Sequence, residues 1–139
     1  MTTTIDDCRL LDFPRITSRE GSITPLEETS SVPFSIARIF YIYDVPGGAS
    51  RGGHAHRDVE QLIVSVMSSF DVVLDDGHNR RVVTLNRAYY GLYVPKLIWS
   101  ELVNFSSGAV CLVLASDLYS EDDYFRRYEE FLRFKTGAP

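Results

Sequence analysis

Between Phe34 and Ser116 the chain repeats one pattern, in which a short run of β-branched and aromatic residues ends at a turn signal. Such runs, recurring at intervals of about 8–12 residues, are typical of antiparallel strands. The expected strands are residues 34–43, 59–66, 70–74, 81–85, 89–94, 99–105 and 110–116. This rhythm predicts an all-β sandwich or small barrel and leaves no room for alternating helices in this part of the chain.

The pattern changes toward the C-terminus. The aromatic residues Tyr124, Tyr128, Phe131 and Phe134 are spaced three or four apart, which is the spacing of one helix face. Ser120 followed by an acidic residue three positions later resembles a capping box. We therefore expect a short C-terminal helix over residues 120–134, with residues 22–27 and the extreme N-terminus adding edge strands.

Composition narrows the function classes. The 139 residues suit one domain over residues 1–139, and the net charge of −5 makes a broad nucleic-acid-binding face unexpected. The apolar runs are too short to span a membrane, and the polar, acidic start of the chain does not resemble a signal peptide. We expect a cytoplasmic protein that does not bind nucleic acid or membranes.

One short segment concentrates residues suited to chemistry. His54 and His56 are two apart, so in a strand both imidazoles lie on one face. Glu60 follows at an even spacing and would reach the same face of an extended chain. Two imidazoles and a carboxylate suit a divalent metal, whereas two imidazoles alone suit proton transfer near neutral pH. A solvated histidine pair on a strand edge is the third interpretation.

The spacing of these residues resembles the first motif of the cupin superfamily. Gly48 is followed after five residues by His54-Ala55-His56, and after three more by Glu60. This resemblance implies a cupin jelly roll, a double-stranded β-helix sandwich.

The second cupin motif is present but altered. Pro95 and Asn104 are in register, while Leu97 stands where the motif has glycine and Ser100 stands where it has the last metal-binding histidine. A serine hydroxyl is a poor ligand for the metals that imidazole suits. The resemblance therefore implies the fold with an incomplete metal site.

A longer series of sequence segments points to one family within the cupins. The phrases RGGHAH, FDVVLDDG, YYGLYVP, IWSEL, NFSSG, VLASDLY and EDDYFRRYEEF, in this order, resemble the nucleotide-linked 4-keto-6-deoxyhexose 3,4-ketoisomerases. The likeness extends over residues 21–134. It implies an isomerase acting without a metal or other cofactor on a TDP-linked 4-keto-6-deoxyhexose, in the synthesis of 3-amino sugars for glycans. It also implies a homodimer, often with exchanged N-terminal strands.

The implied reaction moves a carbonyl from C4 to C3 through an enediol. The resemblance assigns the two proton transfers to His54 and His56, and histidine has a suitable pKa for both. Arg51 is expected to bind the diphosphate or the enediolate oxygen. Family members commonly carry histidine or arginine at Ser100 and arginine or tyrosine near Glu20, so the C4 configuration of the product, gluco or galacto, stays open.

Five more residues are expected to bind substrate, namely Arg38, Tyr41, Tyr43, Gln61 and Ser100. Arg38 lies in an apolar strand, where its guanidinium must face water or an anion, and diphosphate is a suitable partner. Tyr41 and Tyr43 share one strand face, and we expect both phenols to reach the cavity. Strict alternation puts Arg38 on the opposite face unless a bulge intervenes. Gln61 is expected to orient a histidine or a sugar hydroxyl.

Two other functions remain as alternatives at this point. A metal-dependent cupin oxygenase would use His54, His56 and Glu60 as ligands, because three protein ligands can suffice for iron. A non-catalytic sugar-binding cupin would bind the ligand without proton exchange.

Overall fold

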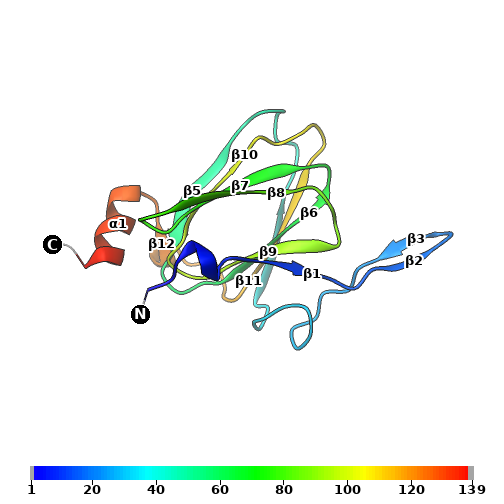
Figure 1. Cartoon of the computed structure of the whole chain (residues 1–139), viewed down its shortest axis with the longest axis horizontal. Coiled ribbons are helices and arrows are strands. Elements are labelled where there is room, and N and C mark those ends of the chain that lie inside the picture. Colours follow the sequence, from blue (N-terminus) through cyan, green and yellow to red (C-terminus); the bar gives the residue numbers. More distant parts are fainter. Residues whose placement is uncertain (1, 138–139) are drawn as a thin grey trace.

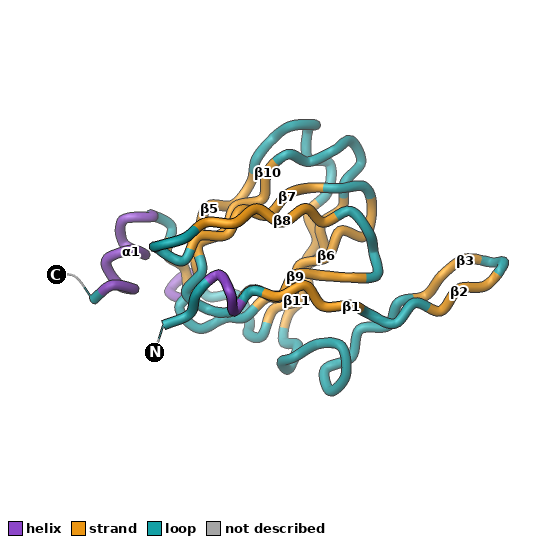
Figure 2. The backbone as a smooth tube through the Cα atoms, in the orientation of Figure 1, coloured by secondary structure: helices purple, strands orange, loops and turns teal. Residues whose placement is uncertain are grey.

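The computed structural model describes residues 2–137 and consists mainly of two five-stranded sheets, shown in Figures 1 and 2. In the first sheet the strand order is β1 (Arg9–Asp12), β9 (Tyr90–Val94), β6 (Gln61–Met67), β11 (Val110–Ala115) and β4 (Arg38–Ile42). In the second it is β12 (Tyr124–Phe125), β5 (Arg51–His56), β10 (Trp99–Val103), β7 (Phe70–Asp75) and β8 (Arg80–Leu85). The pairings within both sheets are antiparallel, and the predicted all-β jelly roll is confirmed.

The main core lies between the two sheets because the strands of each direct alternate apolar residues inward. Leu92 of β9 and Cys111 of β11 meet Val72 and Leu74 of β7 in one buried cluster. Phe70 stacks on Phe105 at a ring-centroid distance of 5.1 Å and closes one end of this cluster. The core thus fills part of the space between the sheets and leaves the remainder open as a cavity.

The C-terminal segment differs from the prediction. It is a short 3-10 turn, η2 (Glu121–Asp123), followed by β12 and then by helix α1 (Tyr128–Thr136). Ser120 caps η2 without a side-chain hydrogen bond, so the expected capping box is wrong. The helix begins later than predicted because Tyr124 and Phe125 pair with β5 instead, and only the residues after them keep the helical period.

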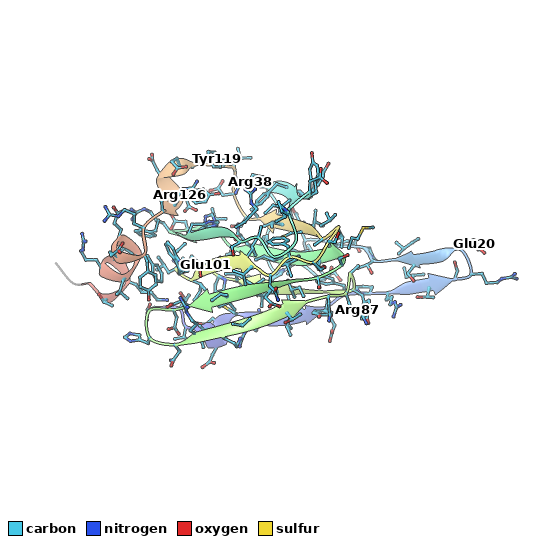
Figure 3. The ribbon with its side chains drawn as sticks, turned by 90° about the horizontal axis from the view of Figure 1, so that it is seen from above. Glu20, Arg38, Arg87, Glu101, Tyr119 and Arg126 are labelled. Atoms are coloured by element: carbon cyan, nitrogen blue, oxygen red, sulfur yellow. The ribbon has the colours of Figure 1, made fainter. Side chains whose placement is uncertain are left out.

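The N-terminal segment leaves the sandwich. After the 3-10 turn η1 (Ile5–Asp7) and β1, the chain forms a hairpin of β2 (Ile16–Ser18) and β3 (Gly21–Ile23). All six strand residues of this hairpin are exposed, and Figure 1 shows it extending away from the sheets. Figure 3 shows Glu20 at its tip. The predicted strand at residues 22–27 is therefore shorter and begins one residue earlier.

None of the helices within residues 2–137 is long and apolar enough to cross a membrane.

Candidate active site

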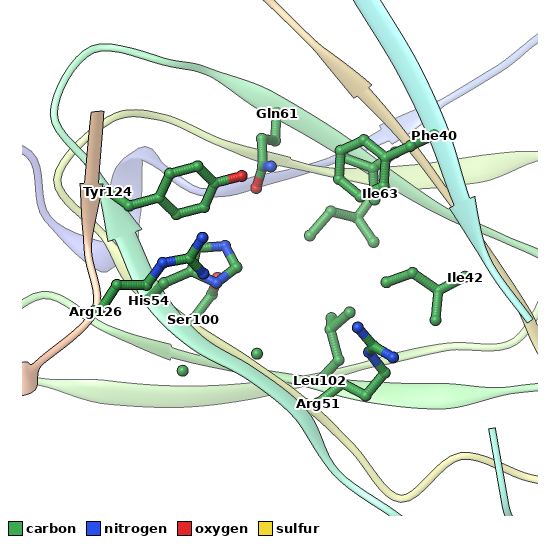
Figure 4. Close-up of a pocket in the computed structure, with 13 residues that line it drawn as sticks. Phe40, Ile42, Arg51, His54, Gln61, Ile63, Ser100, Leu102, Tyr124 and Arg126 are labelled. Atoms are coloured by element: carbon green, nitrogen blue, oxygen red, sulfur yellow. The ribbon is translucent and has the colours of Figure 1, made fainter. Parts of the chain in front are cut away.

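A cavity of about 340 Å³ opens between the two sheets (Figure 4). Its residues come from strands of both sheets and from the C-terminal segment. They are Phe40, Ile42, Arg51, Gly52, Gly53, His54, Gln61, Ile63, Ser100, Leu102, Val113, Tyr124 and Arg126. The set combines an apolar floor with two arginines and contains no carboxylate, so the cavity suits an uncharged sugar ring joined to an anionic group.

A bulge in β5 directs its residues at this cavity. In the pairing with β10, Ser100 lies opposite His54, but the next residue, Glu101, lies opposite Gly52. Gly52 and Gly53 have φ angles of +88° and +102°, which residues with a Cβ rarely adopt. The two glycines therefore allow the strand to bend here while it remains hydrogen-bonded to β10.

The two histidines lie side by side, as their spacing predicts. Their ring centroids are 5.0 Å apart with the planes nearly perpendicular. His54 lines the cavity. His56 is not among the lining residues, and its side chain is only 6% exposed. Burial lowers the pKa of His54 to about 4, with further lowering by His56 and Arg126, so His54 is neutral at pH 7 and able to accept a proton.

His56 is held by a carboxylate from the C-terminal segment. Its Nδ1 lies 2.6 Å from Oδ2 of Asp123, and the Asp123 side chain is itself only 10% exposed. Burial lowers the pKa of His56, and the hydrogen bond to Asp123 opposes this effect. Nε2 of His56 is buried without a hydrogen-bond partner among the described residues.

The same segment places an arginine at the cavity wall. Nε and one terminal nitrogen of Arg126 donate to the two carboxylate oxygens of Glu121, both at 2.9 Å. The guanidinium lies 3.9 Å from the centroid of the Tyr124 ring. Figure 4 shows it beside His54, with the Tyr124 side chain directed toward Gln61. Arg126 is therefore a fixed positive charge close to the neutral histidine.

Three residues expected to bind substrate line the cavity together with His54, namely Arg51, Gln61 and Ser100. Gln61 and Ser100 are buried, and Arg51 is exposed at the other side of the opening from Arg126 (Figure 4). The cavity thus has arginines on two sides.

The two strand tyrosines do not reach this cavity. β4 alternates as predicted, but Phe40 and Ile42 face inward, while Tyr41 and Tyr43 are 62% and 60% exposed on the outer face. The expectation that Tyr41 and Tyr43 enter the cavity of their own chain is corrected. The physical reason is that alternate side chains of a strand point to opposite faces, and the apolar Phe40 and Ile42 occupy the inward face.

Arg38 shares the inward side of β4 with Phe40. Its guanidinium lies 5.2 Å from the Phe40 ring and 5.6 Å from the Tyr119 ring, and Nε is buried without a hydrogen bond to the described residues. Figure 3 shows Arg38, Tyr119 and Arg126 on the same side of the molecule. Arg38 also lowers the pKa of His56 by its charge. It lies near the histidines, although it is not one of the cavity-lining residues.

Glu60 does not join the histidines. Its Oε1 accepts a hydrogen bond from the hydroxyl of Tyr93, which belongs to the other sheet from the His-bearing strand. Within residues 2–137, no three His, Cys, Asp or Glu side chains come together as a metal site would require. The ligand set His54, His56 and Glu60 proposed for an oxygenase is therefore not assembled.

Sequence reasoning missed Asp123, Tyr124 and Arg126. All three lie in the segment for which the aromatic spacing predicts a helix with a capping box. The sequence signal for these residues is the segment EDDYFRRY, whose charged residues all come before Tyr128, the first residue of helix α1. Recognising that this phrase forms an added strand beside β5 requires knowledge of tertiary pairing.

The chain is similar to proteins of a known family. Residues 6–136 match the family model described as FdtA: WxcM-like, C-terminal. The TDP-4-oxo-6-deoxy-alpha-D-glucose-3,4-oxoisomerase of Aneurinibacillus thermoaerophilus is 42% identical over 126 residues, which are 91% of each chain.

Two solved structures are also similar. A 3,4-ketoisomerase from Helicobacter canadensis has a TM-score of 0.91 and 44% identity, covering 94% of this chain and 98% of that one. QdtA, a sugar 3,4-ketoisomerase from Thermoanaerobacterium thermosaccharolyticum in complex with TDP, has a TM-score of 0.93 and 32% identity, covering 96% and 98%. The predicted resemblance is confirmed, and the chain belongs to the FdtA, WxcM-like C-terminal family of cupin-fold proteins that includes sugar 3,4-ketoisomerases.

Proposed function

We propose that this protein is a sugar-nucleotide 3,4-ketoisomerase that converts a TDP-linked 4-keto-6-deoxyhexose to its 3-keto isomer. The observation that carries the proposal is a neutral His54 at the wall of a cavity with arginines on two sides and no lining carboxylate. The names of the relatives supply the reaction class and the nucleotide. This activity is favoured over the oxygenase, because Glu60 does not accompany the histidines.

In the proposed reaction a neutral imidazole removes the proton from C3. The electrons of the C3–H bond form the C3=C4 double bond of an enediolate, whose negative charge lies on O4. Transfer of the O3 proton to O4 moves the negative charge to O3, and reprotonation at C4 then leaves a carbonyl at C3 and a hydroxyl at C4. The two carbons thus exchange oxidation levels without an external oxidant. We assign these proton transfers to His54 and His56, with His54 as the one at the cavity surface.

The charged residues have separate proposed tasks. Arg126 is close to His54 and would stabilise the oxygen that becomes negative in the enediolate. Arg51, across the opening, would bind the diphosphate, while Arg38 remains a candidate for the same anion. Gln61 and Ser100 would bind sugar hydroxyls from the buried side of the cavity.

The proposal includes a homodimer and a cytoplasmic location, both from the resemblance to this family. The exposed hairpin supports the dimer, since Ile16 and Ile23 are 59% and 65% exposed. The outer face of β4 adds Ile39, Tyr41 and Tyr43, which are similarly exposed. A second copy of the chain would cover these apolar side chains.

Nuclear magnetic resonance in deuterated water tests the activity. Chelator-treated protein is incubated with TDP-4-keto-6-deoxyglucose while the sugar protons are followed. Deuterium at C3 or C4 with a 3-keto product is expected, and the H4 coupling gives the gluco or galacto configuration. His54→Asn and His56→Asn should each slow conversion by about 10²–10⁴-fold. If wild-type protein yields no exchange with this substrate or other nucleotide-linked 4-keto sugars, the proposal is wrong.

A further inference from the structure

The carboxylate of Asp123 orients His56, and each of its two oxygens takes part in a hydrogen bond. Oδ2 of Asp123 lies 2.6 Å from Nδ1 of His56, and Oδ1 accepts the backbone N–H of Asp58 at 2.8 Å. The backbone carbonyl of Asp123 accepts the N–H of Arg57 at 2.8 Å. The two residues that follow His56 in the chain therefore hold Asp123 in place, and Asp123 in turn holds the imidazole.

This arrangement selects one form of the imidazole. An ionised carboxylate only accepts hydrogen bonds, so the hydrogen of a neutral His56 must be on Nδ1. Nε2 is then a lone-pair acceptor, and it is buried without a hydrogen-bond partner among residues 2–137. The rings of Tyr124 and His54, at centroid distances of 4.5 Å and 5.0 Å, limit rotation of the imidazole.

We propose that Asp123 is a positioning residue that keeps His56 in the Nδ1–H tautomer, so that its Nε2 lone pair is available for proton transfer. The contribution to catalysis rests on the ketoisomerase function proposed above, whereas the tautomer is a property of the free protein. Burial favours the neutral ring and lowers the pKa of His56. Asp123 opposes this effect through its hydrogen bond and its charge, while Arg38 and Arg126 add to the lowering.

The geometry also predicts that asparagine cannot take over the role of this aspartate. In an Asp123→Asn variant, the oxygen of the amide is needed to accept the Asp58 N–H, which cannot pair with an N–H₂ group. The amide nitrogen then faces Nδ1 of His56 and donates to it. His56 must therefore place its own hydrogen on Nε2, and the acceptor needed for proton transfer is lost although the number of hydrogen bonds is preserved.

The test combines imidazole nitrogen spectroscopy with kinetics. In ¹⁵N-histidine-labelled, substrate-free protein at neutral pH, we expect the His56 hydrogen on Nδ1 in the wild type and on Nε2 in Asp123→Asn. In the isomerisation assay, kcat of this variant should fall by about 10²–10⁴-fold with KM changed by less than about threefold. Asp122→Asn is the matched control, because the Asp122 side chain is exposed and makes no hydrogen bond to the described residues.

The outcomes separate the two proposals. A wild-type His56 with its hydrogen on Nε2 overturns the inference without any variant, so poor folding of Asp123→Asn does not remove the test. An Asp123→Asn enzyme with wild-type kcat also overturns it. If the tautomers are as expected but wild-type protein does not isomerise nucleotide-linked 4-keto sugars, the positioning of His56 is supported and the proposed function is wrong.

Discussion

The two ends of the chain meet the sandwich in opposite ways. The C-terminal segment pairs with β5 through Tyr124 and Phe125 and contributes Asp123 and Arg126 to the site. The N-terminal hairpin β2–β3 is exposed at every strand residue and extends away from the sheets (Figure 1). The difference indicates that one end completes the candidate site of its own chain, whereas the other has exposed apolar surface that a second copy could cover. The predictions below test this division.

The largest effect is expected from loss of the anchor of the C-terminal segment. Phe131 is fully buried and packs against Trp99 and Phe125, so Phe131→Ala should lower the free energy of unfolding by about 3–5 kcal/mol. Phe134, which is 53% exposed, is the control, and Phe134→Ala should cost about 1 kcal/mol or less. Urea denaturation measures both values. Equal costs would show that the helix is not anchored through Phe131.

The next effect concerns Arg126. Arg126→Met removes the positive charge beside His54 and should reduce kcat/KM about 100-fold, or by about 2.7 kcal/mol. Arg127→Met is the matched control, because Arg127 is exposed and its nearest carboxylate contacts are long, at 3.9 and 4.0 Å. Steady-state kinetics should show the control within about twofold of wild type. Similar losses in both variants would assign the effect to net charge and not to this position.

The hairpin should affect assembly without altering the cavity. Ile16→Asp combined with Ile23→Asp places charges on its exposed apolar side chains and should weaken the proposed dimer at least about tenfold. Analytical ultracentrifugation measures this change, and Val82→Asp, on an exposed residue of β8, serves as the control. An unchanged association constant would show that the hairpin is not part of the interface.

The smallest expected effect is a shift in the pH profile. Because the folded protein lowers the pKa of His54 from its usual 6.5 to about 4, kcat/KM should remain nearly constant as pH falls through 6.5 and decline toward pH 4. The lowering is caused first by burial, then by His56 and Arg126, so Arg126→Met should move the acidic limb upward. The hairpin variant should leave it unchanged. A wild-type limb centred at 6.5 would contradict the burial of His54.

The same shift has a consequence for stability. Protonated His54 is favoured in the unfolded chain, so the stability due to neutral His54 is fully present above pH 6.5 and is lost as pH falls toward about 4. The free energy of unfolding should therefore decrease over this interval, and the decrease should be smaller in His54→Asn. Chemical denaturation at several pH values gives the comparison.

Much of the sandwich could be predicted from local sequence. The strands around Ile63, Val72 and Val113 were expected because β-branched runs and turn residues alternate there, and the facing of His54 with His56 follows from strand geometry. The inward face of β4 could not be assigned, because Phe40 and Tyr41 are both aromatic and only packing decides which is buried.

The rest of the site depends on contacts between distant segments. Asp123 reaches His56 across 67 positions of the chain, and the aromatic spacing around it is compatible with a helix. Tertiary pairing with β5 overrides that preference at Tyr124 and Phe125. Glu60 is the opposite case. Its even spacing from His56 predicts a shared strand face, but its carboxylate accepts a hydrogen bond from Tyr93 instead.

The docking of β12 on β5 also has a consequence for the order in which the protein becomes functional during synthesis. Translation proceeds from the N-terminus, so both histidines are made well before the segment from Glu121 to Arg126. A nascent chain ending at Ser120 contains the strands of the sandwich other than β12, but it has neither the carboxylate that holds His56 nor the guanidinium beside His54. A premature stop at this point would remove Asp123 and Arg126 from the candidate site, and it would also remove Phe125 and Phe131 from the buried cluster that they form with Ala55 and Trp99.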